Sequence, residues 1–248
     1  MKINLKLLLL ITIPVITFSS CSKDDKEDTP ANYLTYGIYI VNEGSFGAGN
    51  SSVSYLNLQS GTMSNDVFEI TNGFPLGDVA QSMTILNNKG YIVVNNSQKI
   101  EVVDLSNMQS IATISGFQSP RYFVTSNNKG YVSDWFDNNI KVIDLTTNTI
   151  TNTIPTGNGP EQMVINSNKL FVVNVGGFGT DNTVTVIDLT AETVLTTVTV
   201  GVNPNSLCTD ANGKIWVLCS GSTGPDFTGG TADDIAGSLW KLNPSDQT

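Results

Sequence analysis

The sequence predicts an all-β fold assembled from a repeated unit, and three observations support this prediction. First, an Asn-Lys-Gly-Tyr block followed by apolar residues returns about every 40 residues. These blocks begin at Asn88, Asn128, Asn168 and, more loosely, Asn212. Second, a Val-Val-Asp-Leu or Val-Ile-Asp-Leu block follows the first three, at 102–105, 142–145 and 186–189. Third, no adequate stretch outside residues 1–20 carries the apolar period of a helix, so we expect helices to be nearly absent. Units repeated at a fixed period cannot bury their apolar faces alone and must stack on neighbours.

Each unit contains four short runs rich in Val, Ile, Thr and aromatic residues, separated by Gly, Asn, Asp and Pro. In the third unit the runs cover 121–126, 130–134, 140–145 and 149–154. Four strands in a unit of this length are typical of a β-propeller blade. A β-sandwich does not repeat its turns at a fixed register, and solenoid coils are usually shorter. We therefore predict a β-propeller of four-stranded blades.

The number of blades follows from where the units start. The first segment, Gly37 to Asn42, matches the second strand of a blade, and the last unit ends after the strand from Gly237 to Leu242. The four units between begin near Val79, Pro120, Pro160 and Pro204. We expect about four and a half blades in residues 33–248, out of roughly seven in a closed ring. The sequence therefore looks C-terminally incomplete.

Residues 1–20 have the features of a signal peptide. Lys2 and Lys6 form a basic start, and the apolar run from Leu7 to Phe18 is too short to span a bilayer comfortably. Two serines then precede Cys21, and small residues before a cysteine resemble the bacterial lipobox, in which that cysteine is lipid-modified. The alternative is a plain secretory signal with an incidental cysteine.

The acidic segment 21–32 is predicted to be a flexible tether, because its density of charge prevents a packed core. An acidic run directly after a lipidated cysteine also resembles the surface-export signal of Bacteroidetes lipoproteins. We therefore expect a lipid-anchored protein on the outer membrane, displayed at its outer face.

The composition weighs against several functions. The chain has 12 basic and 22 acidic side chains, a net charge of −10 and no histidine. An acidic surface disfavours nucleic acid as a partner, because phosphate neutralisation dominates such binding. Histidine is the commonest general base and metal ligand, so its absence argues against an enzyme, although carboxylate catalysis remains open.

Two cysteines, Cys208 and Cys219, flank the turn at Asn212 and Gly213. We expect them to share parity on facing strands, so that a diagonal disulfide and two buried free thiols both fit. No other cysteine or histidine of the domain completes a ligand set, so no metal site and no cofactor are predicted.

Candidate binding residues lie where the repeat varies. Each unit has a polar pair at the start of its inner strand, usually after a proline, and the pair differs in every unit. These pairs are Gln81 and Ser82, Arg121 and Tyr122, Glu161 and Gln162, and Asn205 and Ser206. The surrounding sequence repeats while these side chains differ, which predicts that the polar pairs line a ligand site at the centre of the propeller. The alternative is that they are ordinary solvent-facing loop residues.

The loops after the second strand supply aromatic candidates. Trp135 and Phe136 are adjacent in a polar loop, so we expect one to pack inward and the other to be exposed, unless both pack between blades. Phe178 lies in a glycine-rich loop without a phosphate-binding pattern, and we include it among the ligand-binding residues. The loop from Ser220 to Ala236 is long enough to suggest a function.

The strictly repeated Asp104, Asp144 and Asp188 invite a catalytic interpretation. Because they recur in every complete unit, we predict instead that they cap turns by hydrogen bonds from side chain to backbone.

The repeat blocks and the segment 153–160 resemble the YVTN-type propeller repeat. The segment from Tyr39 to Gly47 is similar to the opening of a Bacteroidetes family of surface propeller lipoproteins, the domain of unknown function 5074 family. That family includes proteins that bind vitamin B12 and pass it to an outer-membrane transporter. The resemblance implies a corrinoid ligand and a transporter partner for this chain.

The leading hypothesis is therefore a non-enzymatic surface binding protein in which five of the candidates matter most. These are Arg121, Tyr122, Trp135, Phe136 and Gln162. The alternatives are an adhesion or interaction module for a protein or host glycan, and a metal-dependent propeller hydrolase. For the hydrolase, the aligned column of polar pairs offers only one carboxylate, Glu161.

Overall fold

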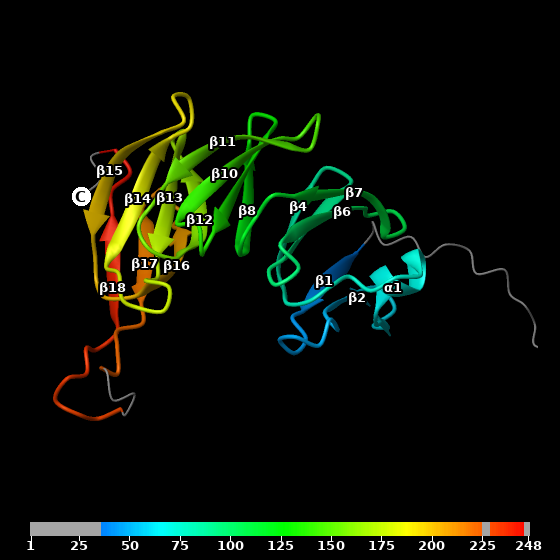
Figure 1. Cartoon of the computed structure of the whole chain (residues 1–248), viewed down its shortest axis with the longest axis horizontal. Coiled ribbons are helices and arrows are strands. Elements are labelled where there is room, and N and C mark those ends of the chain that lie inside the picture. The colour runs from blue at the N-terminus through cyan, green and yellow to red at the C-terminus, as the bar shows by residue number, and fades with distance from the viewer. Residues whose placement is uncertain (1–35, 225–228, 246–248) are drawn as a thin grey trace, which may run out of the picture. The chain divides into compact units, whose positions relative to one another are not determined.

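The computed structural model describes residues 36–224 and 229–245, which belong to the compact unit Asn32–Thr248. The signal peptide, Cys21 and the tether predicted for residues 1–32 lie outside the described residues. The described part is all-β apart from one short helix, and its five antiparallel sheets follow one another in chain order (Figure 1). Among the described residues, no helix is long and apolar enough to cross a membrane.

Three of the sheets have four strands that pair in chain order. The second sheet consists of β4 (Ala80–Leu86), β5 (Lys89–Val94), β6 (Lys99–Asp104) and β7 (Gln109–Ser115). The third consists of β8 (Pro120–Ser126), β9 (Lys129–Asp134), β10 (Asn139–Asp144) and β11 (Thr149–Pro155). The fourth consists of β12 (Pro160–Asn166), β13 (Lys169–Asn174), β14 (Thr183–Asp188) and β15 (Thr193–Thr199).

The first and last sheets have three strands each. The first consists of β1 (Gly37–Asn42), β2 (Ser52–Asn57) and β3 (Met63–Ser64). The last consists of β16 (Pro204–Thr209), β17 (Ile215–Cys219) and β18 (Ser238–Leu242). The predicted fold class and the predicted unit starts are confirmed, because β4 begins one residue after Val79 and β8, β12 and β16 begin at the predicted prolines.

The repeated Asn-Lys-Gly block forms the tight turn between the first and second strands of a unit. Between β8 and β9 the two turn residues, Asn127 and Asn128, have φ of 50° and 61°, as a type I′ hairpin turn requires. A Cβ atom at Gly130 would collide with the ring of Phe123, so this glycine is needed for close packing within the hairpin. At Gly90 a Cβ would meet the terminal methyl group of the flexible Met83 side chain, so glycine is less strictly required there.

The repeated aspartates cap turns, as predicted. The Oδ1 atoms of Asp104, Asp144 and Asp188 accept hydrogen bonds from the backbone N–H two residues later, at 2.8, 2.7 and 2.7 Å respectively. The pKa of Asp104 is lowered mainly by its hydrogen bond with the Ser106 hydroxyl, and that of Asp144 by the backbone N–H of Thr146. Their role in these units is therefore structural.

Apolar clusters fill the four spaces between successive sheets, so that the second, third and fourth sheets bury both faces and the first and last sheets bury one face each. Between the second and third sheets, the rings of Tyr91 and Phe123 are stacked with centroids 4.8 Å apart. Both residues occur at repeated positions of their strands. Side chains of neighbouring units are therefore in contact, as the stacking inferred from the repeat requires.

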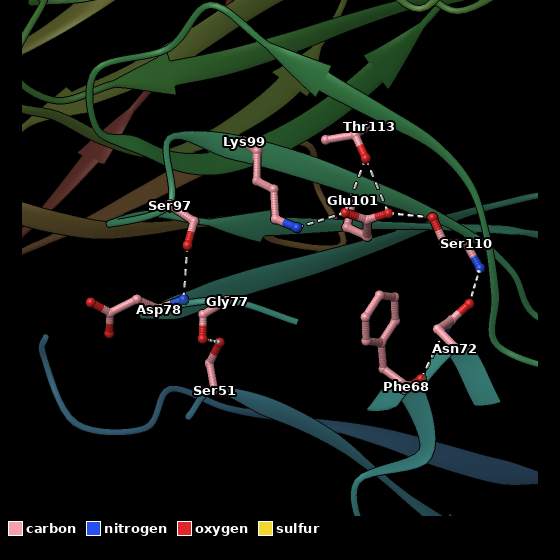
Figure 2. A network of polar contacts seen from close by, with 10 residues as sticks. All are labelled: Ser51, Phe68, Asn72, Gly77, Asp78, Ser97, Lys99, Glu101, Ser110 and Thr113. Atoms are coloured by element: carbon pink, nitrogen blue, oxygen red, sulfur yellow. Dashed lines mark hydrogen bonds and ion pairs between the residues drawn. The ribbon is translucent and has the colours of Figure 1, made fainter. Parts of the chain in front are cut away.

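The helix α1 (Val67–Asn72) was not expected, because six residues are too few to show a helical period. It buries Val67 and Phe68 between the first two sheets. Asn72 joins it to the second sheet. Its Oδ1 accepts from the Ser110 N–H at 2.8 Å (Figure 2). Its Nδ2 donates to the Met108 carbonyl at 2.9 Å. The helix therefore contacts both the first and the second sheet.

A buried carboxylate lies beside this helix. Glu101, on β6, is 1% exposed and pairs with Lys99 Nζ at 2.8 Å. The hydroxyls of Ser110 and Thr113 donate to the same carboxylate (Figure 2). Its charge is therefore compensated from three side chains, and we assign it a structural role.

Neither arrangement predicted for the cysteines is found. Cys208 is opposite Trp216 and Cys219 is opposite Pro204, so the two lie at opposite ends of the β16–β17 pair. Both are free; Cys219 is buried, whereas Cys208 is exposed. The expected shared parity fails because the turn is centred on Asn212 alone, which places Cys208 opposite Trp216 and not opposite Val217.

Candidate ligand-binding site

The predicted polar pairs lie at β-bulges at the start of each inner strand. Pro120 is opposite Asp134 and Phe123 is opposite Val132, so Arg121 and Tyr122 share one partner position. The register also shifts after Ala80, Pro160 and Pro204 in the other sheets. A bulge inserts one residue and turns side chains out of the regular alternation.

The second residue of a pair joins neighbouring inner strands. The Ser82 hydroxyl donates to the Arg121 carbonyl at 2.7 Å, and Gln162 Oε1 accepts from the Leu207 N–H at 2.8 Å. Tyr122 packs against the cluster between the third and fourth sheets. These three predicted site residues thus take part in contacts that hold the sheets together, and a ligand contact for them stays a prediction.

The first residues of two pairs form an ion pair between sheets. Arg121 Nη2 lies 2.7 Å from Glu161 Oε1, and Arg121 Nε donates to Glu161 Oε2 at 2.9 Å. The Arg121 guanidinium also lies over the ring of Trp135, 5.8 Å from its centroid. This bidentate geometry fixes the guanidinium plane, which a lysine could not do.

Three aromatic residues converge beside this ion pair, and we call Trp135, Phe136 and Phe178 the aromatic shelf. The ring centroids of Trp135 lie 5.3 Å from those of both phenylalanines, which are 5.8 Å apart. Phe136 is 57% exposed and Phe178 is 91% exposed, whereas Trp135 is partly buried. The prediction that one of the adjacent pair packs inward and the other is exposed is confirmed.

The shelf depends on a glycine that sequence reasoning did not select. Gly159 has φ of +60°, and a Cβ there would lie 2.6 Å from Trp135 Nε1 and overlap the backbone nitrogen of Gly177. Its N–H donates to Asn138 Oδ1 at 2.9 Å. The loop before β12 therefore passes tightly against the loops that carry the shelf. The glycine-rich segment 153–160 was the only sequence signal for it.

Two carboxylates fix the same loops. Asp134 is fully buried, and its oxygens accept from the backbone N–H groups of Gln118 and Ser119 at 2.8 and 2.7 Å. The pKa of Asp134 is raised overall, because the effect of burial outweighs that of these two hydrogen bonds, which lower it. Asp181 accepts from the Asn158 N–H at 2.9 Å. Such contacts preorganise the loops, which is a property of binding sites built on rigid scaffolds.

The remaining predicted residues lie apart from the shelf. In the part of the chain that the structure describes, no hydrogen bond, ion pair or ring contact joins Gln81, Asn205 or Ser206 to it. The Asn205 Oδ1 atom is buried and has no partner there. The described residues also contain no group of three or more His, Cys, Asp or Glu side chains that could hold a metal ion.

One family model and several solved structures match this chain. The family model DUF5074, described as a domain of unknown function, matches residues 36–224. No curated protein matches the chain.

Three solved structures illustrate the fold. Hydrazine synthase from Kuenenia stuttgartiensis is 14% identical, with a TM-score of 0.57 over 71% of this chain and 51% of that chain. The computationally designed protein Ika8 is 14% identical, with a TM-score of 0.56 over 82% of this chain and 57% of that one. The WD40 β-propeller domain of Doa1 is 16% identical, with a TM-score of 0.51 over 70% of this chain and 58% of that one. At these identities the likeness shows a β-propeller fold alone, and the chain spans less than two thirds of each of these structures.

Proposed function

Because the chain belongs to the DUF5074 family and has a β-propeller fold, we propose that it is a non-enzymatic binding protein whose ligand lies on the aromatic shelf. One observation carries this proposal: Phe136 and Phe178 come from different sheets and meet, although most of each side chain is exposed. Contiguous exposed apolar surface is unfavourable in water and marks binding sites. Aromatic faces of this kind suit a ligand with a broad apolar surface.

The polar groups at the shelf indicate what the edge of the ligand should carry. Arg121 uses Nε and Nη2 for Glu161, so Nη1 keeps its donors without a partner among the described residues. Trp135 Nε1 is a buried donor that also has no partner there. A ligand edged with hydrogen-bond acceptors, such as carboxamides, complements such donors.

We propose a corrinoid as the ligand. Its wide ring system and its amide-bearing edge match the two properties above, and the family resemblance supports the same choice. The lipobox-like sequence before Cys21 and the acidic segment after it support lipid anchoring at the outer face of the outer membrane, where the ligand would pass to a transporter partner.

Calorimetric titration of the full chain with cyanocobalamin tests this proposal. We expect Phe178→Ala to weaken binding at least tenfold, because the substitution removes one of the three shelf rings (about 1.4 kcal/mol or more). Phe46→Ala is the matched control, since Phe46 is 81% exposed in the corresponding loop of the first sheet and makes no ring contact with the shelf. Equal affinity of both variants, or no binding at micromolar ligand, would contradict the proposal.

Anchoring is tested separately in cells. We expect labelled fatty acid to be incorporated into the wild-type chain and not into Cys21→Ser, and external protease to digest the wild-type protein on intact cells. Protection from protease in intact cells would contradict surface display while leaving the ligand proposal standing.

A further inference from the structure

A second concave surface lies beside Phe178, between the β13–β14 loop and the β17–β18 loop. This groove has a volume of about 910 Å³, within the range of ligand pockets. Its lining residues are Phe178, Gly179, Thr180, Asn203, Ser220, Gly221, Ser222, Thr223, Gly224, Asp234, Ile235 and Ala236. The ion pair of Arg121 and Glu161 is not among them, so the groove differs from the shelf in everything except Phe178.

Backbone hydrogen bonds fix the wall on the β17–β18 side. Ser222 and Ile235 exchange two of them, at 2.9 and 2.8 Å, and so join the two arms of the loop. The Ser220 N–H donates to the Asn203 carbonyl at 3.0 Å. Gly221 has φ of +76°, and a Cβ there would overlap the Ile235 carbonyl oxygen, so the two arms can approach only at a glycine. The wall is therefore preformed.

One residue of the groove, Asn203, has a buried hydrogen-bond acceptor without a donor among the described residues. Asn203 has φ of 53°, and its Nδ2 donates to the Gly221 carbonyl at 2.9 Å, which fixes the orientation of the amide. Its Oδ1 is buried and has no donor among the described residues. A buried acceptor without a partner is costly, so a hydroxyl group of a bound molecule would be stabilised here.

The remaining chemistry of the lining is hydroxyl-rich and acidic. Four serine and threonine side chains contribute hydroxyls, and Asp234 contributes a carboxylate. The lining contains no lysine or arginine. Anionic ligands are therefore disfavoured, whereas a neutral ligand with many hydroxyl groups finds both donors and acceptors. The broad face of Phe178, 91% exposed, provides an apolar platform at one side.

We propose that this groove binds a neutral oligosaccharide, with the apolar face of one sugar ring packed on Phe178 and a sugar hydroxyl donating to Asn203 Oδ1. The alternative of a cationic peptide would use the Asp234 carboxylate but leave Phe178 and the Asn203 acceptor without a specific role. The proposal does not depend on a corrinoid ligand at the shelf.

Calorimetric titration of the full chain with four neutral hexasaccharides tests the proposal: maltohexaose, cellohexaose, xylohexaose and mannohexaose. Hexalysine and an oligogalacturonate serve as charged probes. We expect at least one neutral hexasaccharide to bind at concentrations up to about 10 mM, and the oligogalacturonate not to bind. Binding of hexalysine alone, or of none of the neutral sugars, would overturn the proposal.

Two substitutions locate the binding. Asn203→Gly removes the amide and tolerates the positive φ, and Phe178→Ala changes a side chain too exposed to affect folding. Each should weaken sugar binding at least about tenfold, whereas Phe46→Ala should not change it. Asn203→Gly should leave cyanocobalamin binding unchanged, so that failure at the groove is distinguishable from failure at the shelf. Sugar binding that survives both substitutions would place the site elsewhere and overturn the proposal.

Discussion

The two ends of the sheets are built on different principles. At one end, which we call the turn end, tight hairpins such as Asn127–Asn128 and the aspartate-capped turns repeat from unit to unit. At the other, the loop end, the loops of Trp135 and Phe178 differ in length and sequence and contact one another across sheets. Contacts at the turn end are mostly made within one sheet, whereas the ring contacts of the aromatic shelf at the loop end join two sheets. The repeat therefore specifies the scaffold, and departures from it specify the surface that can bind.

Electrostatics distinguish the ends as well. Exposed carboxylates at the turn end, such as Asp144, have lowered pKa values because backbone N–H groups donate to them. At the loop end Asp134 is buried, and its pKa is raised by that burial. One carboxylate is thus stabilised in its charged form, and the other in its protonated form.

The largest expected effect is at the loop end, where Arg121→Ala leaves Glu161 without its partner. Since the Glu161 side chain is 9% exposed and that of Arg121 is 24% exposed, we expect urea unfolding to show a loss of about 2–3 kcal/mol, somewhat less than for a fully buried pair. Replacing both residues by methionine should restore most of this stability. A double variant as unstable as Arg121→Ala would show that the loss comes from packing and not from the uncompensated charge.

At the turn end, Gly130→Ala should cost about 2 kcal/mol in urea unfolding, because the added Cβ collides with the Phe123 ring. Gly179→Ala is the matched control at the loop end: its Cβ would meet its nearest neighbour, the Gly176 carbonyl oxygen, at an ordinary 3.5 Å. The control should be close to neutral. Equal losses for both would mean that the collision with Phe123 does not set the effect, because the reduced entropy of the unfolded chain favours alanine at both positions.

The pH dependence of stability should separate the two kinds of carboxylate. The raised pKa of Asp134 means that the folded state holds its proton more tightly than the unfolded chain. Its contribution is therefore complete below the ordinary value of about 3.9 and is lost as the pH rises through the raised pKa. Asp134→Asn should remove this decline in unfolding measurements from pH 3 to 7. The substitution preserves the size and shape of the side chain, and the equivalent position of the next sheet already carries an asparagine, Asn174.

Asp144→Asn should have the opposite signature. Because the pKa of Asp144 is lowered in the folded state, its contribution is present above about 3.9 and is lost as the pH falls through the lowered value. The variant should therefore be less stable than the wild type near neutral pH and similar to it at strongly acidic pH. Parallel pH profiles for the two variants would refute the distinction between the ends.

The smallest effect is expected for the turn-end ion pair of Lys129 and Glu192, in which the lysine side chain is 44% exposed. Lys129→Met should change stability by less than about 1 kcal/mol, because solvent screens the pair. Raising the salt concentration should reduce even that difference. A loss comparable to that of Arg121→Ala would show that exposure does not govern the strength of these pairs.

Periodicity predicted the strands and the unit starts well, because each hairpin is determined by residues close in sequence, such as Asn128 and Gly130. It did not predict the meeting of Trp135 with Phe178, since two loops of unequal length must first fold against each other. Gly159 was missed for the same reason: the atoms that exclude a side chain there belong to Trp135 and Gly177. The expected shared parity of the two cysteines was wrong because the turn is centred on Asn212 alone, which changes the register of the strand pair by one residue.

The fit between Phe123 and Gly130 has an evolutionary consequence. Both residues belong to one hairpin, so a duplicated gene segment carries the large ring and the space for it together. A copied unit therefore keeps the fit within its own hairpin without a second mutation. The contact of Trp135, Gly159 and Phe178 spans two units, so the duplication of a single unit does not carry it.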